Sequence, residues 1–234
     1  MQDIINIDKS FNNDKMRILL LTTKNESIVP FDYQDLLAGV IHRWLGINEL
    51  HDKISLYSFS WLNGASLCKL GFNFERGSQW FISFHEKDYL KTIIKSIQTS
   101  PEMFCGMRVT DVIIKDAPDF TYVENFILAS PIFLKERHEN AIKHLIYTDE
   151  NVERLLEYSI KHKMSIANIP EDDSFKISID RSSRMCKTKI VKIHDISNKS
   201  FYCPIHITAK NKTKQFIWDV GLGHSTGVGF GSIY

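Results

Sequence analysis

The spacing of apolar residues in the first half of the chain predicts alternating strands and helices. Apolar residues at positions 36, 37, 40, 41, 44 and 45 follow helical spacing, and Pro30 and Gly46 bracket that segment. Shorter segments on either side have the pattern of strands. The predicted elements are strand 16–23, helix 31–45, strand 56–62, strand 79–85, helix 86–98 and strand 107–115. Their order, β-α-β-β-α-β, predicts a ferredoxin-like unit.

The second half of the chain has a similar mixture with fewer helical patterns. Residues 116–120 (DAPDF) have the composition of a connector, and apolar positions along 148–163 follow one helix face. The other predicted strands are 124–133, 175–179, 188–194, 202–209 and 215–220. We therefore expect an α+β protein with two domains, residues 1–117 and residues 118–234.

Composition places the chain among ordinary globular proteins. Its 234 residues are 43% hydrophobic and 24% charged, and no segment approaches the roughly 18 consecutive apolar residues of a membrane span. The first residues lack the basic and apolar regions of a signal peptide. We therefore expect a cytoplasmic protein with no membrane partner.

The residues that commonly bind metal ions lack the spacing of a metal site. The four cysteines, Cys68, Cys105, Cys186 and Cys203, form no C-x-x-C pair, so we expect neither zinc nor a disulfide but reduced, mostly buried thiols. His138 and His144 are six residues apart, which matches no metal-binding motif. The sequence therefore predicts no metal and no cofactor.

Positive charge is concentrated in the last quarter of the sequence. Residues 1–173 carry 19 Lys and Arg against 25 Asp and Glu, whereas residues 174–234 carry 10 against 3. This distribution is typical of a surface that binds a polyanion, most simply nucleic acid, although a solvated basic face has the same composition. The densest group is Arg181, Arg184, Lys187, Lys189 and Lys192.

Two of these lysines are placed to follow phosphates. Because side chains alternate along a strand, Lys187 and Lys189 should point to the same face. Lys210, Lys212 and Lys214 are interpreted instead as a hairpin turn, where their charge is solvated.

Glycine is concentrated near the end of the sequence, where five of the eleven glycines lie between residues 221 and 231. Such a cluster is expected where the backbone takes a positive φ or lets another group approach closely, and a run of exposed N–H groups can bind an anion. Val228 stands where a Walker loop needs lysine, and Thr226 stands where a dinucleotide-binding fingerprint needs its third glycine. The loop therefore predicts binding to a phosphate backbone by a motif other than a Walker loop or a dinucleotide-binding fingerprint.

The glycine spacing resembles a known signature. Gly221-Leu222-Gly223, five residues and then Gly229-Phe230-Gly231 is similar to the C-terminal signature of CRISPR-associated endoribonucleases that process repeat RNA. This resemblance implies two tandem ferredoxin-like units, with the loop in the second. The family often carries Lys or Arg within the five residues, where this chain has only His224. With the basic group, the implied RNA-binding residues are Gly221, Gly223, His224, Ser225, Thr226, Gly227, Gly229 and Gly231. A purely structural glycine-rich hairpin is the alternative.

Two histidines in the first half are candidates for acid and base chemistry. His42 lies near the end of the first predicted helix, and His51 follows the break at Gly46. The pattern of residues 37–42 (LAGVIH), 50–51 (LH) and 57–60 (YSFS) looks like the first-domain signature of the same family. The resemblance implies that His51 is the general base, that His42 shares the work where many members have tyrosine, and that Lys53 is the nearby lysine. From the sequence alone, the alternative is that His42 is an ordinary helix-end residue and His51 a solvent-facing turn residue, neither of them catalytic.

Together these features predict a metal-independent endoribonuclease that cuts CRISPR precursor RNA within repeats. The 2′-hydroxyl is the expected nucleophile, and a 2′,3′-cyclic phosphate and a 5′-hydroxyl are the expected ends. The alternatives are a non-catalytic RNA-binding subunit of the same superfamily and a small-molecule nucleotide enzyme. The expected partners are CRISPR repeat RNA and other CRISPR effector subunits. Both a monomer and a homodimer fit the sequence.

Overall fold

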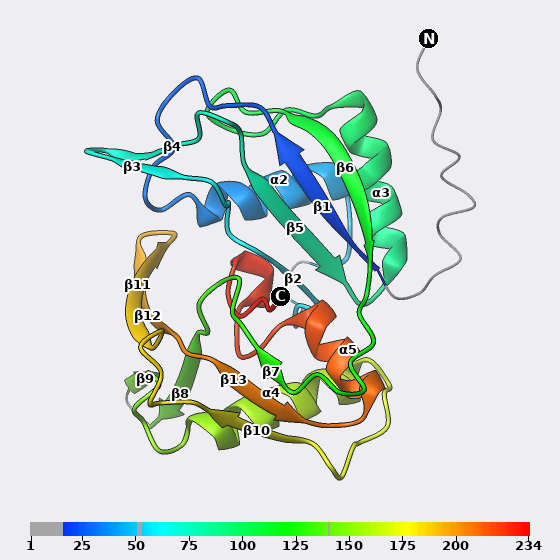
Figure 1. Cartoon of the computed structure of the whole chain (residues 1–234), viewed down its shortest axis with the longest axis vertical. Coiled ribbons are helices and arrows are strands. Elements are labelled where there is room, and N and C mark those ends of the chain that lie inside the picture. Colours follow the sequence, from blue (N-terminus) through cyan, green and yellow to red (C-terminus); the bar gives the residue numbers. More distant parts are fainter. Residues whose placement is uncertain (1–15, 51–52, 140) are drawn as a thin grey trace.

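The protein consists of two α+β units, one above the other in Figure 1, with the C-terminal residues between them. The computed structural model describes residues 16–50, 53–139 and 141–234. Within these ranges, no helix is long and apolar enough to cross a membrane.

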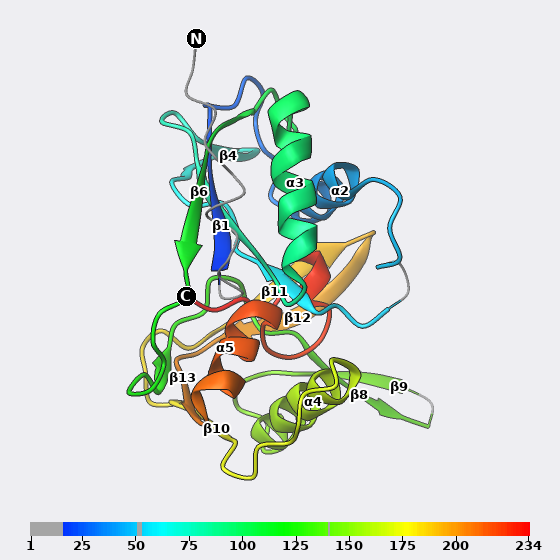
Figure 2. The same cartoon turned by 90° about the vertical axis from the view of Figure 1, so that its right-hand side faces the viewer.

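The first unit is a four-stranded antiparallel sheet with two helices on one face (Figure 2). A short hairpin, β3 (Ser66–Cys68) and β4 (Gly71–Asn73), is inserted between its second and third strands. The order β2-β5-β1-β6 and the β-α-β-β-α-β connectivity confirm the predicted ferredoxin-like unit. Its elements are β1 (Met16–Thr22), α2 (Gln34–Leu45), β2 (Tyr57–Phe59), β5 (Gln79–Phe84), α3 (Lys87–Thr99) and β6 (Val109–Asp116).

The end of α2 is set by its sequence. Leu37, Ile41 and Trp44 are buried at helical spacing, which holds this face of the helix in the core. Gly46 then takes a φ of +66°, and its N–H donates to the carbonyl oxygen of His42 at 3.0 Å. The chain therefore leaves the helix at the glycine, where the sequence predicted the break.

The second unit has the same connectivity, with its last strand supplied by residues 232–234. The N–H of Ala129 donates to the carbonyl oxygen of Ser232 at 2.8 Å, and the N–H of Tyr234 donates to that of Ile127 at 3.0 Å. This pairing completes a second β-α-β-β-α-β unit, so the protein has a tandem ferredoxin-like fold. Its regular elements are β7 (Asn125–Phe126), α4 (Val152–Ile166), β10 (Lys176–Ile179), β13 (Ile205–Thr208) and α5 (Asn211–Val220), and the sheet order is β10-β13-β7.

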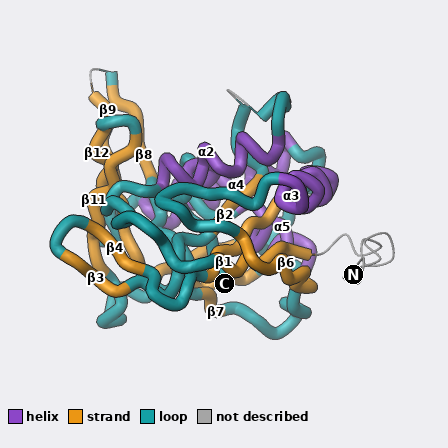
Figure 3. The backbone as a smooth tube through the Cα atoms, turned by 90° about the horizontal axis from the view of Figure 1, so that it is seen from above, coloured by secondary structure: helices purple, strands orange, loops and turns teal. Residues whose placement is uncertain are grey.

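Two hairpins and a short 3-10 helix are added to the second unit. The first hairpin is β8 (Leu134–His138) with β9 (Ala141–Leu145), and the second is β11 (Lys187–Ile193) with β12 (Ile196–Tyr202). Figure 3 shows both at one side of the molecule, where β9 and β12 contact each other. The 3-10 helix η1 (Thr226–Val228) lies within the glycine-rich loop.

The predicted strand 215–220 is wrong, because these residues belong to the helix α5. The buried residues Thr213, Phe216, Ile217 and Val220 recur at helical spacing once the residues before 215 are included. The predicted turn at Lys210, Lys212 and Lys214 is also wrong. Lys214 is buried on α5, and its Nζ donates to the carbonyl oxygen of Phe120 at 3.3 Å.

Three other expectations for the second half need correction. Only Asn125–Phe126 is a strand within the predicted strand 124–133. The predicted strand 202–209 is divided between β12 and β13 at Pro204, which has no N–H to donate to a sheet. Cys186 and Cys203, expected as reduced thiols, form a disulfide across 17 residues of sequence.

The apolar side chains form two main clusters, one in each unit. The first includes buried residues from Met16 to Val109, and the second includes buried residues from Phe120 to Ile233. Ala117 packs against the second cluster, and the boundary between residues 117 and 118 remains a prediction.

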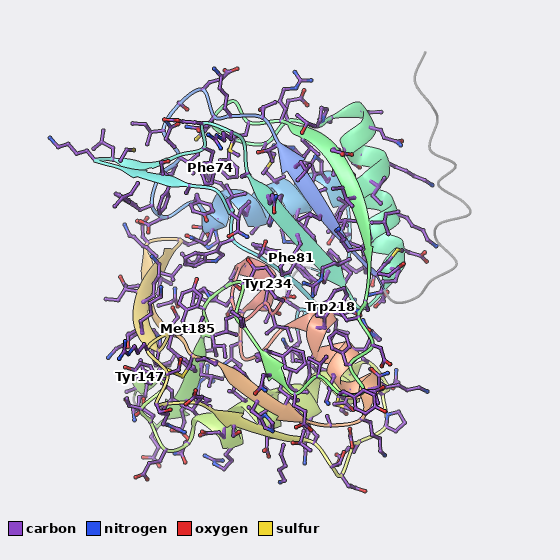
Figure 4. All side chains as sticks on the ribbon, in the orientation of Figure 1. Phe74, Phe81, Tyr147, Met185, Trp218 and Tyr234 are labelled. Atoms are coloured by element: carbon purple, nitrogen blue, oxygen red, sulfur yellow. A yellow bond between two sulfur atoms is a disulfide. The ribbon has the colours of Figure 1, made fainter. Side chains whose placement is uncertain are left out.

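Arg17 joins the two units. Its guanidinium lies 3.4 Å from the centre of the Trp218 ring and 4.0 Å from that of Phe81. It also donates to the carbonyl oxygens of Trp218, at 2.9 Å, and Ile233, at 3.0 Å. Figure 4 shows Phe81, Trp218 and Tyr234 where the units meet. This buried cation therefore ties β1 to the end of α5 and to the C-terminal strand.

Candidate functional site

The glycine-rich loop leaves the end of α5 and is closed by backbone hydrogen bonds. The N–H of Leu222 donates to the carbonyl oxygen of Gly231 at 2.8 Å. Two further bonds tie the loop to residues 131–133. The N–H of Gly231 donates to the carbonyl oxygen of Pro131 at 2.8 Å, and the N–H of His224 donates to that of Phe133 at 2.9 Å. The segment that precedes β8 thus holds both sides of the loop.

The other side of the loop packs against β2 and the residues around it. The hydroxyl of Tyr57 donates to the carbonyl oxygen of Gly227 at 3.2 Å, and the indole of Trp61 donates to that of Gly229 at 2.7 Å. A Cβ added to Gly229 would lie 3.1 Å from the ring of Phe59. Gly229 also takes a φ of +96°, so a side chain here would be strained and would crowd the protein's own aromatic rings.

As predicted, the loop glycines take positive φ values or have other atoms close to their backbone, but these atoms belong to the protein itself rather than to a ligand. Most of the loop is buried between the two units, and its exposed or half-buried residues are His224, Ser225 and Val228. This tip is the part of the loop that is most accessible to a ligand. Of the other expected RNA contacts, Gly221, Gly227, Gly229 and Gly231 are buried behind the tip, whereas the buried Gly223 and Thr226 border the cavity described below.

Gly231→Ala is expected to lower the free energy of unfolding by about 2–5 kcal/mol. Gly231 has a φ of +66°, and an added Cβ would collide with the carbonyl oxygen of Leu222. The control is Gly39→Ala on α2, where nothing lies within 4 Å of an added Cβ, and which should raise stability by about 0.5–1 kcal/mol. Urea denaturation measures both. A Gly231→Ala protein as stable as the wild type would contradict the loop geometry.

Lys163 links α4 to the start and to the middle of the loop. Its Nζ donates to the carbonyl oxygens of Val220, at 3.0 Å, and Gly221, at 3.3 Å, and to the hydroxyl of Thr226, at 3.2 Å. Burial lowers the pKa of Lys163 from 10.5 to about 7. Because the unfolded chain holds this proton more tightly, the stability contributed by Lys163 increases as the pH rises from about 7 towards 10.5.

His224 presents a neutral imidazole at the loop tip. Its Nδ1 accepts a hydrogen bond from the backbone N–H of Lys135 at 3.1 Å, which assigns the ring proton to Nε2. Burial, together with the charges of Lys135 and Lys163, lowers the pKa of His224 to about 4. His224 therefore offers an N–H donor but no positive charge at neutral pH.

A cavity of about 370 Å³ lies between the loop tip, α4, the start of β8 and the segment before β2. Lys53, one of the predicted catalytic residues, lines this cavity, and its ammonium pairs with the exposed carboxylate of Glu49 at 2.9 Å. None of the described residues that line the cavity is acidic. They are Lys53, Ile54, Ser55, Lys135, Tyr158, Ser159, His162, Lys163, Gly223, His224, Ser225, Thr226 and Val228.

Of the two predicted catalytic histidines, His42 is the one among the described residues. His42 is half-buried in the last turn of α2, which contacts η1 of the loop. His51 lies outside the described residues, between Leu50, which packs against the first core, and Lys53. The roles of His42, His51 and Lys53 remain predictions.

The structure divides the predicted basic group. Arg181 forms an ion pair with Glu153 and also donates to the carbonyl oxygen of Tyr147 at 2.8 Å. Lys192 pairs with Asp195 at 2.7 Å. Two of the five predicted cations thus have local partners within the protein.

Two of the other three basic residues lie beside aromatic rings. Lys187 and Lys189 are on the same side of β11, as predicted, with ammonium groups 5.0 Å from the ring centre of Tyr202 and 5.4 Å from that of Trp61. Arg184 and Lys187 line a cavity of about 290 Å³. Cations beside aromatic rings are suited to contact both the phosphates and the bases of a single strand.

Comparison with protein families identifies the relationship. A family model described as "CRISPR associated protein Cas6, C-terminal" matches residues 115–234, just over half of the chain. This chain belongs to the Cas6 family. No curated protein sequence matches it significantly.

Solved structures of other proteins share the fold of this Cas6-family chain. A Cas6-related protein from Pyrococcus furiosus has a TM-score of 0.80 and 22% identity, with 94% of this chain and 98% of that chain covered. An "RAMP protein binding different RNA substrates" has a TM-score of 0.79 and 20% identity, with 93% and 98% covered. Cse3 from Thermus thermophilus, bound to RNA in a pre-cleavage complex, has a TM-score of 0.53 and 8% identity, with 94% and 98% covered.

Sequence reasoning missed four residues that complete the cavity: Lys135, Tyr158, His162 and Lys163. Lys163 did leave a signal, because it falls in phase with the buried residues Leu156 and Ile160 of α4. A lysine on an apolar helix face needs polar partners, and here the loop supplies them. Among the described residues, no group of three or more His, Cys, Asp or Glu side chains is arranged to hold a metal ion.

Proposed function

We propose that this Cas6-family protein is a metal-independent endoribonuclease that cleaves CRISPR precursor RNA within its repeats. The observation that carries the proposal is the cavity lined by Lys53, Lys135 and the exposed tip of the glycine-rich loop. A phosphate needs cations and N–H donors there, and carboxylates would repel it. The RNA-bound state of the Thermus Cse3 structure and the RNA substrates named for the RAMP structure support RNA as the ligand.

The proposed reaction uses the RNA's own nucleophile. His51 or His42 removes the proton of the 2′-hydroxyl, which attacks the adjacent phosphorus. The other histidine donates a proton to the departing 5′-oxygen, and Lys53 offsets the charge that develops on the phosphate. The bond to the 5′-oxygen breaks, leaving a 2′,3′-cyclic phosphate and a 5′-hydroxyl.

The loop tip would position the scissile phosphate. The Nε2–H of His224 and the exposed Ser225 can donate to phosphate oxygens. Because Lys163 fixes the start of the loop and Thr226, which follows Ser225, these donors are held in place before RNA arrives.

Incubation of the full chain with repeat RNA in EDTA tests this function. The expected products are single cuts within each repeat, with ends that resist phosphatase until the cyclic phosphate is opened. RNA that is bound but uncut would instead identify a non-catalytic RNA-binding subunit. Cleavage only after Mg²⁺ is restored would replace the proposed chemistry with a metal-dependent one.

Replacing Lys187 and Lys189 together with alanine is expected to make RNA binding less salt-dependent. The slope of log K against log salt should fall by about one to two, at roughly 0.7 per single-strand phosphate contact. Titrations at several salt concentrations measure the slope. The control replaces Lys91 and Lys95 of α3, which removes the same charge elsewhere and should leave the slope unchanged. Equal slopes for both variants would place the RNA on another face.

A further inference from the structure

Two aromatic side chains border the cavity from α4. Tyr158 and His162 are one helical turn apart, and their rings are nearly parallel, with an interplanar angle of 14° and centroids 6.2 Å apart. Both side chains are exposed, and Tyr158 retains 65% of its accessible surface. They are therefore not part of the core that the opposite face of α4 forms.

The charges around this pair favour an anionic ligand. Lys53 and Lys135 line the same cavity, which has no acidic lining residue among those described. The neighbouring cavity on the other side of Lys53 and Ile54, by contrast, is lined by Glu49 and Glu86. An anionic strand is thus favoured on the α4 side, where Lys135 lies, over the side of the carboxylates, one of which pairs with Lys53.

The size of the cavity favours a single nucleotide. Its volume of about 370 Å³ is near the lower end of the range for small-ligand pockets, about 300–1,000 Å³. A duplex would not enter a pocket of this size, whereas one unpaired base with its phosphate matches an aromatic surface beside lysines.

The aromatic pair is held in a fixed position relative to the loop tip. Lys163 follows His162 on α4 and donates to Gly221 and Thr226 of the loop. Since α4 and the loop are joined by this buried contact, a base on Tyr158 and a phosphate at Ser225 would bind to one rigid surface.

We propose that Tyr158 and His162 form a stacking platform for one unpaired nucleobase of the RNA, next to the phosphate held by Lys53 and the loop tip. This inference rests on the proposed function and adds a base-binding subsite to it. Every base has an aromatic face, so stacking here adds affinity and sets the position of the strand without requiring one sequence.

The test measures binding of repeat RNA that carries 2-aminopurine at successive positions near the cut and a 2′-deoxy sugar that blocks cleavage. Tyr158→Leu is expected to weaken binding by about tenfold, the effect of losing one base–aromatic stack. It should also abolish the 2-aminopurine fluorescence change at one position. Tyr158→Phe keeps the ring and should behave as wild type. The matched control is Tyr122→Leu, which removes an even more exposed tyrosine outside the cavity.

The outcomes separate this inference from the proposed function. Cleavage of natural repeat RNA by the wild type, measured in parallel, tests the function by itself. If the wild type cleaves and Tyr158→Leu binds as tightly as Tyr122→Leu, the platform is rejected while the function stands. If Tyr158→Leu binds RNA normally but no longer associates with another protein, the platform is also rejected, and this surface is a docking site for protein instead.

Discussion

A repeat RNA with a 2′-deoxy sugar immediately 5′ of the scissile phosphate is expected to bind normally and to remain uncut. The substitution removes the proposed nucleophile and leaves every phosphate in place, so contacts to Lys53 and the loop tip are retained. Cleavage should fall below detection, because no other group replaces the missing hydroxyl. Gel analysis of end-labelled RNA, with affinity measured in parallel, provides both readouts.

The position of the deoxy sugar and the presence of EDTA give this experiment its controls. The same substitution two nucleotides away should leave cleavage unchanged. EDTA should have no effect on the all-ribose substrate, whereas a nuclease that activates water with a metal would cut the deoxy RNA and stop in EDTA. Cleavage of the deoxy substrate at the ordinary rate would end the proposed mechanism.

His51→Ala is expected to lower the cleavage rate by about 10²-fold or more, with little change in RNA affinity. Loss of a general base typically costs about 10²–10⁴-fold in rate, since the 2′-hydroxyl is then deprotonated only by solvent. Single-turnover cleavage with saturating enzyme separates the chemical step from binding. His206→Ala is the matched control, because His206 is a half-buried histidine beside Glu124 in the second unit, outside the cavity.

The same assay applied to His42 variants distinguishes the general base from the general acid. If His51 is the base and His42 the acid, each single variant is slow, and the double variant is little slower than either because the groups act in one step. His42→Ala also needs a measurement of stability, since His42 belongs to the last turn of a packed helix. Near wild-type cleavage by His51→Ala would transfer the base to His42 or reject this site altogether.

Much of the fold could be predicted because each element of the first unit carries its own pattern. The buried residues of α2 and the break at Gly46 are local features, and local features are readable from a window of a few residues. The same method failed at 215–220, where apolar and β-prone residues of a helix looked like a strand. There the packing of α5 between the units, rather than intrinsic propensity, determines the secondary structure.

The candidate site was only partly predictable. Glycine spacing identified a special backbone, and the helix break identified the segment that contains His51 and Lys53. Residues 53–55 and 223–226 line one cavity but are about 170 positions apart in sequence. Neither local pattern can therefore indicate that they lie together. Periodicity tells which face of an element is buried but not which other element covers it.

The sequence by itself determined the element order of the first unit, the need for glycine in the loop and the basic character of the last quarter. Each of these follows from residue type and short-range spacing. Only the tertiary structure decided that the loop is buried against Tyr57 and Trp61, that His224 is neutral, and that Lys163 holds the loop to α4. These properties depend on burial and on partners distant in sequence, because desolvation and hydrogen bonding act between groups that only folding brings together.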